Sequence, residues 1–251
     1  MANWSDQQFG TTPSSTTTAT GVAVDAGLRA YMLSVYNYMT SGILLTGIIA
    51  VLIGNTTAVQ SLISYNALTG HISPSVLGWI VTFAPLGVVL WMSFGINRLS
   101  TGMAQFLFWA FAVLMGASLS TIFLVYTDGS IALTFFATAA AFASLSLYGY
   151  TTKRDLSGMG TFLLMGLVGI IVASIVNLFW MNDTFSLVIA AIGVLVFAGL
   201  TAYDTQKIKS MYFQVAGSDM IGKTAIMGAL TLYLDFINMF LFLLRFLGNR
   251  E

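Results

Sequence analysis

The stretch SLVIAAIGVLVFAGLTAYDTQKIK, residues 186–209, places Asp204 and two lysines directly after a fifteen-residue apolar run. A second aspartate, Asp235, stands inside another apolar run, GALTLYLDFINMFLFLLRFLG, residues 228–248. Runs of this kind predict membrane-spanning helices, and an aspartate at the centre of such a helix costs roughly 2.5–3.5 kcal/mol to insert. The two aspartates are therefore the first candidates for a functional site.

The composition indicates an integral membrane protein. Of the 251 residues, 57% are hydrophobic and only 7% are charged, whereas a soluble globular protein is about 25% charged. Nine basic and nine acidic residues give a net charge of zero, which argues against a nucleic-acid partner. The chain has no cysteine, so disulfides and thiol chemistry are excluded.

Seven apolar runs are long enough to cross a bilayer, which takes about 20 residues. They are continuous rather than alternating, so they predict helices and not barrel strands. The expected fold is an all-α membrane protein with seven transmembrane helices over Ala30–Gly54, Val76–Ile96, Ala104–Tyr126, Ile131–Tyr150, Gly160–Trp180, Thr184–Asp204 and Ala225–Leu247. Residues 1–22 are interpreted as a disordered, Ser/Thr-rich cytoplasmic tail, and residues 23–251 as the transmembrane domain.

The basic residues predict the orientation, because cytoplasmic loops are enriched in lysine and arginine. Seven of the nine precede the first span or lie in alternate loops, namely Arg29, Arg98, Lys153, Arg154, Lys207, Lys209 and Lys223. Only Arg245 and Arg250 fall on the other side. The pattern predicts a cytoplasmic N-terminus and a C-terminus on the opposite side of the membrane.

Asp235 lies about ten residues, or roughly 15 Å, into the last predicted span, which is near the middle of the membrane. A carboxylate at that depth faces the interior of the bundle or water and has a partner. Two interpretations stay open. One is an interhelical hydrogen bond that only fixes packing, and the other is an ion or proton site.

Asp204 ends the sixth predicted span, where an ion pair with Lys207 three residues later would explain it. However, the short connection between the last two spans favours antiparallel neighbours, with Asp204 facing Asp235. Two carboxylates in a low dielectric do not both ionise cheaply, so the pair would share a proton and respond to pH. Ionised, the same oxygens would suit Ca²⁺. The predicted boundaries place Asp204 about 10–15 Å closer to the cytoplasm than Asp235, and an offset of that size argues against direct contact between the two carboxyl groups.

Two further polar residues are candidates for the same site. Arg98, on the predicted cytoplasmic side, is either a partner for one of the aspartates or only a marker of topology. Asn238 shares one face of the last span with Asp235 and would extend a polar track along it.

Several blocks of the chain resemble the Bax inhibitor family, the transmembrane Bax inhibitor motif proteins. LTAYDTQKIKSMY (200–212) and GALTLYLDFINMFLFLLRFLG (228–248) are similar to the two C-terminal signatures of that family. Other blocks of the family, especially of its bacterial members, are similar to SLYGYTTKRDLSGMG (146–160), VDAGLRAYMLSVYNYM (24–39) and LMGASLSTIFLVYT (114–127). The resemblance covers about residues 23–251.

The resemblance implies seven spans with the C-terminal helix at the centre of the bundle. It also implies a Ca²⁺ leak gated by a di-aspartyl pH sensor, which matches Asp204 in YDTQ and Asp235 in LDFIN. A basic residue that latches to the first aspartate corresponds by position to Arg98. Bacterial relatives are linked to a membrane-anchored ATP-dependent (AAA) protease, as substrate or modulator. The expected location is a bacterial inner membrane, with the C-terminus in the periplasm.

The leading hypothesis is therefore a pH-sensitive calcium leak channel in the lipid bilayer, with calcium as the transported ion and no cofactor. Asp204 and Asp235 would be the calcium ligands. The alternative is a non-catalytic modulator or binding partner of the membrane-bound AAA protease, with the N-terminal tail as its handle. Intramembrane aspartyl proteases also use two aspartates. Here the second lies in LYLD rather than in Gly-x-Gly-Asp, and no enzyme activity is expected.

Overall fold

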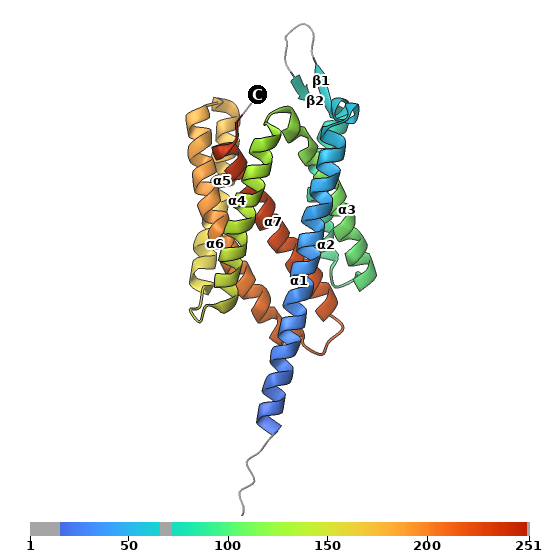
Figure 1. Cartoon of the computed structure of the whole chain (residues 1–251), viewed down its shortest axis with the longest axis vertical. Coiled ribbons are helices and arrows are strands. Elements are labelled where there is room, and N and C mark those ends of the chain that lie inside the picture. Colours follow the sequence, from blue (N-terminus) through green and yellow to red (C-terminus); the bar gives the residue numbers. More distant parts are fainter. Residues whose placement is uncertain (1–15, 66–71, 250–251) are drawn as a thin grey trace, which may run out of the picture.

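The computed structural model describes residues 16–65 and 72–249 and has an all-α architecture. Seven helices in the described part of the chain are long and apolar enough to cross a membrane, as predicted. The elements in chain order are α1 (Thr16–Gly54), η1 (Thr57–Leu62), β1 (Ile63–Tyr65), β2 (Ile72–Pro74), α2 (Val76–Gly95), α3 (Thr101–Leu119), η2 (Ser120–Leu124), α4 (Asp128–Thr151), α5 (Ser157–Trp180), α6 (Asp183–Val215) and α7 (Ile221–Leu247). Figure 1 shows them as one elongated bundle, with the short β1–β2 hairpin projecting at one end.

Polar caps fix where four of the helices begin. The side chain before each helix accepts a hydrogen bond from a backbone N–H in the first turn, as in Ser75 with Gly78, Ser100 with Met103, Thr127 with Ser130, and Asn182 with Phe185. Such caps satisfy N–H groups that have no partner within the helix. They explain why α3, α4 and α6 begin up to three residues earlier than hydropathy alone predicted.

The third predicted span is not one uninterrupted α-helix. The α-helix α3 ends at Leu119, and the tighter 3-10 helix η2 carries the chain on to Leu124. Hydroxyl groups bond back to the backbone at this point, with Ser120 donating to the Ala117 carbonyl and Thr121 to the Ser118 carbonyl. These bonds compete with regular helical bonding and account for the change of helix type.

Helix α7 is the core of the bundle. Buried residues make up 61% of its most apolar stretch, against 17% in α2 and in α5. It packs against α6, α1, α4 and α3, and Figure 1 shows it crossing behind the gap between α1 and α4. The expectation that the C-terminal helix is central is therefore confirmed.

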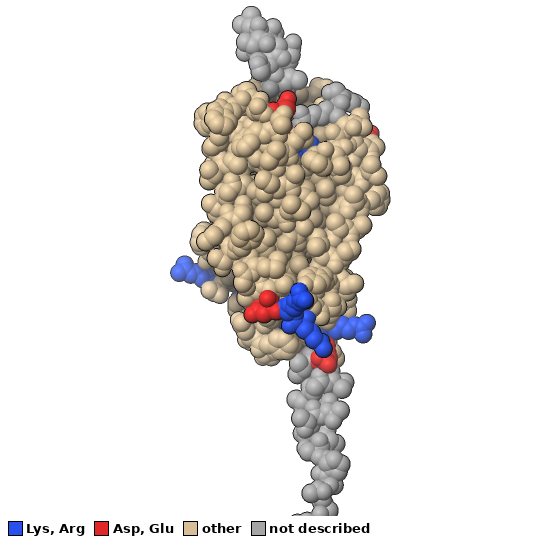
Figure 2. Space-filling model, turned by 90° about the vertical axis from the view of Figure 1, so that its left-hand side faces the viewer, with Lys and Arg blue, Asp and Glu red and all other residues tan. Residues whose placement is uncertain are grey.

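Apart from Asp204 and Asp235, the charged side chains of the described residues lie toward the ends of the bundle. The start of α1 and the connections α2–α3, α4–α5 and α6–α7 meet at one end, which is called here the basic end (Figure 1). Figure 2 shows lysine and arginine side chains gathered there, below a broad uncharged band. The predicted tail, residues 1–22, lies largely outside the described residues, and α1 begins at Thr16. The hypothesis that the tail is a handle for a protease stays a prediction.

Candidate functional site

Helices α6 and α7 form an antiparallel hairpin that brings the two aspartates to a similar depth. Helix α6 does not end at Asp204, as predicted, but continues for 11 more residues to Val215. After the short connection 216–220, α7 reaches Asp235 14 residues beyond its first residue, Ile221. A difference of three residues corresponds to roughly 5 Å along the helices, so the offset is smaller than the roughly 10–15 Å expected from the sequence.

The reason for the early predicted boundary lies in the composition of α6 after Asp204. Gln206, Lys207 and Lys209 lower the hydropathy there, but the helix goes on with a buried side. Ile208 and Tyr212, four residues apart, are both buried on that side. Residues 205–215, which the predicted boundary left outside the span, are thus helical.

The carboxyl groups of Asp204 and Asp235 face each other within hydrogen-bonding reach. Asp204 is 9% exposed and Asp235 is 4% exposed. Asp235 Oδ2 is fully buried, and no N–H or O–H donor from the described residues reaches it. Because ionised carboxylates only accept hydrogen bonds, this contact is favourable when one of the two carries a proton.

Basic side chains offset the negative charge of the two aspartates only weakly. The ammonium of Lys207, one turn after Asp204, acts on that carboxylate through space, but its Nζ atom lies 5.9 Å above the ring of Tyr203. Arg98 is exposed in the α2–α3 turn, and it forms no ion pair in the part of the chain that the structure describes. The latch between Arg98 and an aspartate therefore stays a prediction.

Asn238 bonds to its own helix. Its Nδ2 atom donates to the Leu234 carbonyl at 2.8 Å. The structure thus brings Asp204 and Asp235 together. Among the described residues, the Asn238 side chain makes no other hydrogen bond that would extend the predicted polar track.

Three neighbours of Asp204 in the YDTQKIK stretch join α6 to α4 and to the α4–α5 turn. Gln206 accepts from the Leu156 N–H at 2.9 Å and donates to the Arg154 carbonyl at 2.8 Å. Lys209 donates to the Tyr150 carbonyl at 2.8 Å, at the C-terminal end of α4, where a cation is favourable. In the sequence alone, Lys209 is only a marker of topology. The spacing could have indicated this contact, because residues 205 and 209 are four apart and therefore lie on the same face of the helix.

The third neighbour, Thr205, ends a chain of hydroxyl groups that begins on α1. Tyr36 bonds to Ser146 at 2.7 Å, and Ser146 bonds to Thr205 at 3.0 Å. Thr205 itself donates to the Thr201 carbonyl, so its oxygen accepts from Ser146. Ser146 has then used its single hydrogen, and Tyr36 must be the donor to it. The chain therefore has one direction and ends at the residue next to Asp204.

On the other side, Tyr233 fixes the helix turn that carries Asp235. Its side chain is fully buried and bonds to Thr46 of α1 at 2.7 Å. Thr46 donates its own hydrogen to the Ala112 carbonyl of α3, so Tyr233 is the donor in the first bond. The backbone beside Asp235 is thus tied to α1 and α3, whereas the backbone beside Asp204 is tied to α4.

The site has few ligands for a tightly held metal. Among the described residues, no three His, Cys, Asp or Glu side chains converge. Ca²⁺ takes six to eight oxygen ligands in stable protein sites. Two carboxylates alone supply fewer oxygen ligands than such a site takes.

Comparisons with known proteins agree with the architecture and with the motifs. The family model described as inhibitor of apoptosis-promoting Bax1 matches residues 28–251. The chain is 51% identical to the uncharacterized protein RP147 of Rickettsia prowazekii over 94% of its own length and 96% of that protein. It is 48% identical to the inner membrane protein YbhL of Escherichia coli, over 90% and 94% of the two chains. A Caulobacter vibrioides protein is 45% identical over 92% and 93%. With seven membrane-spanning helices and a match over nearly the whole chain, the protein belongs to the Bax inhibitor-1 family of integral membrane proteins.

Proposed function

We propose that this protein is a pH-sensitive cation leak, with Ca²⁺ as the transported ion, and that the contact between Asp204 and Asp235 is its gate. The observation that carries the proposal is the buried pair of carboxyl groups, one oxygen of which has no donor unless the pair holds a proton. A proton on the pair joins α6 to α7 and keeps the pathway closed. The two helices contact each other more extensively than any other pair, so a change at this contact affects the centre of the bundle.

The direction of the pH effect follows from the chemistry of the pair. At lower pH the pair keeps its proton and the gate stays closed. At higher pH the proton leaves and both carboxylates ionise. They repel each other strongly because the surroundings have a low dielectric. The separated carboxylates then offer oxygen ligands to a divalent cation, so the leak rises with pH.

The test is Ca²⁺ uptake into proteoliposomes that contain the purified protein, from slightly acid to slightly alkaline pH. We expect uptake by the wild-type protein to rise with pH, and the pH dependence to be lost in Asp204→Asn and in Asp235→Asn. The matched control is Asp155→Asn in the exposed α4–α5 turn. Hydrogen bonds from the Ser157 hydroxyl and backbone N–H lower the pKa of Asp155, so it stays ionised throughout the range. Unchanged pH dependence in both variants of the pair would refute the proposal.

The same proposal gives the pair no catalytic role. Hydrolysis by an aspartate dyad needs one ionised carboxylate and one protonated carboxyl that together hold a water. Intramembrane aspartyl proteases carry their second aspartate in Gly-x-Gly-Asp, whereas Asp235 lies in LYLD. Purified protein should therefore leave helical membrane substrates intact, and specific cleavage abolished by Asp235→Asn would contradict this assignment.

We further infer that the protein lies in a bacterial inner membrane with its basic end in the cytoplasm. The relative YbhL is named an inner membrane protein, and the gathering of lysine and arginine at one end follows the positive-inside rule. In this orientation the N-terminus would lie in the cytoplasm and the C-terminus in the periplasm. Alkaline phosphatase fused to the C-terminus should be active in cells, and an inactive fusion at normal expression would argue for the opposite orientation.

A further inference from the structure

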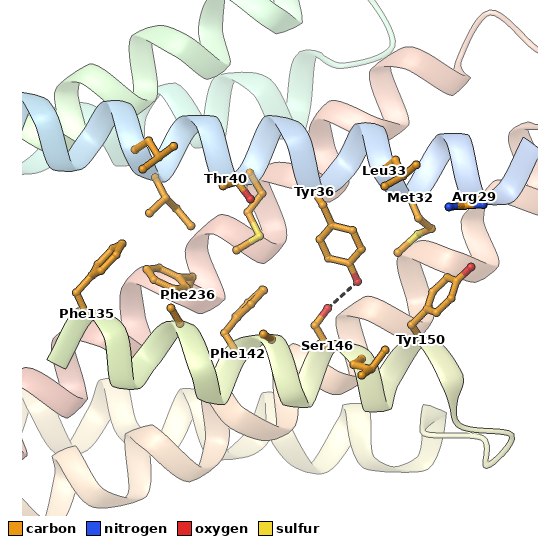
Figure 3. Close-up of a pocket in the computed structure, with 16 residues that line it drawn as sticks. Arg29, Met32, Leu33, Tyr36, Thr40, Phe135, Phe142, Ser146, Tyr150 and Phe236 are labelled. Carbon is orange, nitrogen blue, oxygen red and sulfur yellow. Dashed lines mark hydrogen bonds between the residues drawn. The ribbon is translucent and has the colours of Figure 1, made fainter. Parts of the chain in front are cut away.

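A groove of about 810 Å³ separates α1 from α4 (Figure 3). Both helices pack on α7 but hardly on each other, and Phe236 of α7 lies at the base of the groove. The volume lies within the range of about 300–1,000 Å³ that small-molecule sites occupy. One hydrogen bond crosses the groove, from Tyr36 to Ser146.

The groove opens sideways, toward the lipid. Its rim carries exposed leucines from both helices, with Leu33 at 51%, Leu44 at 56% and Leu147 at 62% exposure. Because α1 and α4 both span the membrane, the opening faces the acyl chains of the bilayer. Apart from the polar end, Thr40 and the Tyr36–Ser146 pair, the lining in Figure 3 is apolar and aromatic, which suits a hydrocarbon chain.

The end of the groove nearest the basic end is polar. Arg29 of α1 and Tyr150 of α4 both lie there in Figure 3, and the Tyr150 ring points toward α1. Arg29 is exposed, and no carboxylate forms an ion pair with it among the described residues. A second cation is near, because Lys209 Nζ lies 4.9 Å from the centre of the Tyr150 ring. An unpaired guanidinium at the membrane surface is suited to a phosphate group.

We propose that this groove binds an anionic phospholipid, with one acyl chain between α1 and α4 and the phosphate on Arg29. An apolar slot with a cation at the depth of the headgroups matches both parts of such a molecule. The bound chain would lie against the Tyr36–Ser146 bond, whose hydroxyl chain ends beside Asp204. The lipid site is independent of ion conduction, so it can be tested whether or not the leak exists.

The test uses the full-length protein in phosphatidylcholine nanodiscs that contain a trace of phosphatidylglycerol with a photoreactive acyl chain. After illumination, mass spectrometry locates the labelled peptides. We expect label on the groove faces of α1 and α4, and competition by unlabelled phosphatidylglycerol. Ala143→Trp fills the groove and should abolish this label, whereas Ala140→Trp, exposed on α4 outside the groove lining, should not. Uniform labelling of all lipid-facing helices, or full labelling of Ala143→Trp, would overturn the proposal.

The headgroup is tested separately through Arg29. Arg29→Gln should weaken labelling by the phosphatidylglycerol probe by about fivefold, the attraction expected from one basic residue at an anionic headgroup. Labelling by a phosphatidylcholine probe with the same acyl chain should stay unchanged. The matched control is Arg154→Gln, an exposed cation at the same end outside the groove. Both substitutions replace exposed side chains, so folding should be preserved. Equal labelling by the two probes, unaffected by Arg29→Gln, would refute an anionic lipid as the occupant.

Discussion

The two hydrogen bonds of Gln206 should make a measurable contribution to the stability of the bundle. The side chain holds the α4–α5 turn through the Leu156 N–H at 2.9 Å and the Arg154 carbonyl at 2.8 Å. Gln206→Met keeps the length and approximate shape of the side chain but makes neither bond. Leu156 is 4% exposed, so its N–H would lose its partner in a buried place, which costs about 1–3 kcal/mol. The Arg154 carbonyl belongs to an exposed residue and turns to water at little cost.

We therefore expect Gln206→Met to lower the free energy of unfolding by about 1–3 kcal/mol. Gln206→Glu keeps an acceptor for the Leu156 N–H and should lose less. The measurement is unfolding in mixed dodecyl maltoside and SDS micelles, followed by circular dichroism. The matched control is Gln214→Met, an exposed position on the same helix where no side-chain hydrogen bond is found. If Gln206→Met and Gln214→Met unfold alike, the two hydrogen bonds of Gln206 contribute nothing to the stability of the bundle, and the prediction is wrong.

Three further predictions concern the gate and its supports. If one proton closes the pair of Asp204 and Asp235, the leak should rise by at most about tenfold per pH unit, and a steeper rise in flux assays would require additional titrating groups. Gly149→Ala should destabilise the protein by about 1–3 kcal/mol, because a Cβ atom there would overlap a backbone carbonyl of α6. In the same unfolding assay Gly169→Ala, which meets open space, should be neutral or stabilising. Tyr36→Phe removes the donor to Ser146 and should cost about 0.5–1.5 kcal/mol, and an unchanged stability would show that the bond across the groove is not formed.

The number of spans and the pairing of the aspartates could be predicted from the sequence, because both depend on hydropathy and on chain order. An apolar run of about 20 residues has no stable place outside the membrane. Likewise, two helices joined by a short connection must lie side by side, which brings Asp204 and Asp235 together. The helix ends were less predictable. Mean hydropathy does not detect a capping residue such as Ser100, and it falls over the polar residues of α6 after Asp204 although these residues are helical.

The supports of the site could not be predicted, because they depend on which helices become neighbours. The bond between Tyr36 and Ser146 joins residues 110 positions apart, and Tyr233 and Thr46 are 187 positions apart. In a chain that is apolar on almost every face, periodicity does not show which face meets which partner. The α1–α4 groove has the same origin, since it exists only because both helices pack on α7 and hardly on each other.

The polar contacts divide the bundle into two groups of helices. Residues next to Asp204 tie α6 to α4 and to the α4–α5 turn, through Thr205, Gln206 and Lys209. Tyr233, next to Asp235, ties α7 to α1 and α3 through Thr46. The pair of aspartates and the Tyr36–Ser146 bond both join one group to the other.

A further polar contact between these groups lies at the opposite end of the bundle from the basic end. There the Asn249 N–H, just after α7, donates to the Ser130 hydroxyl of α4 at 2.9 Å. This bond contains no group that titrates near neutral pH. Loss of the shared proton therefore weakens the contact inside the bundle but leaves this outer contact intact. Residues 216–220 keep α6 and α7 joined at the basic end. The separation should therefore open there between the α2–α3 and α4–α5 turns, with a pivot about the outer end.

Spin labels can measure this motion, because the chain has no native cysteine. Labels at Asn97→Cys and Lys153→Cys, both exposed, report the distance between the two groups at the basic end. Labels at Asn55→Cys and Gly129→Cys, also exposed, report it at the outer end. Raising the pH should lengthen only the first distance, and Asp235→Asn should remove the change because an amide donates to the facing carboxylate at every pH. Equal lengthening at both ends would mean that the groups separate without a pivot, and no change at either end would mean that the aspartate pair does not hold them together.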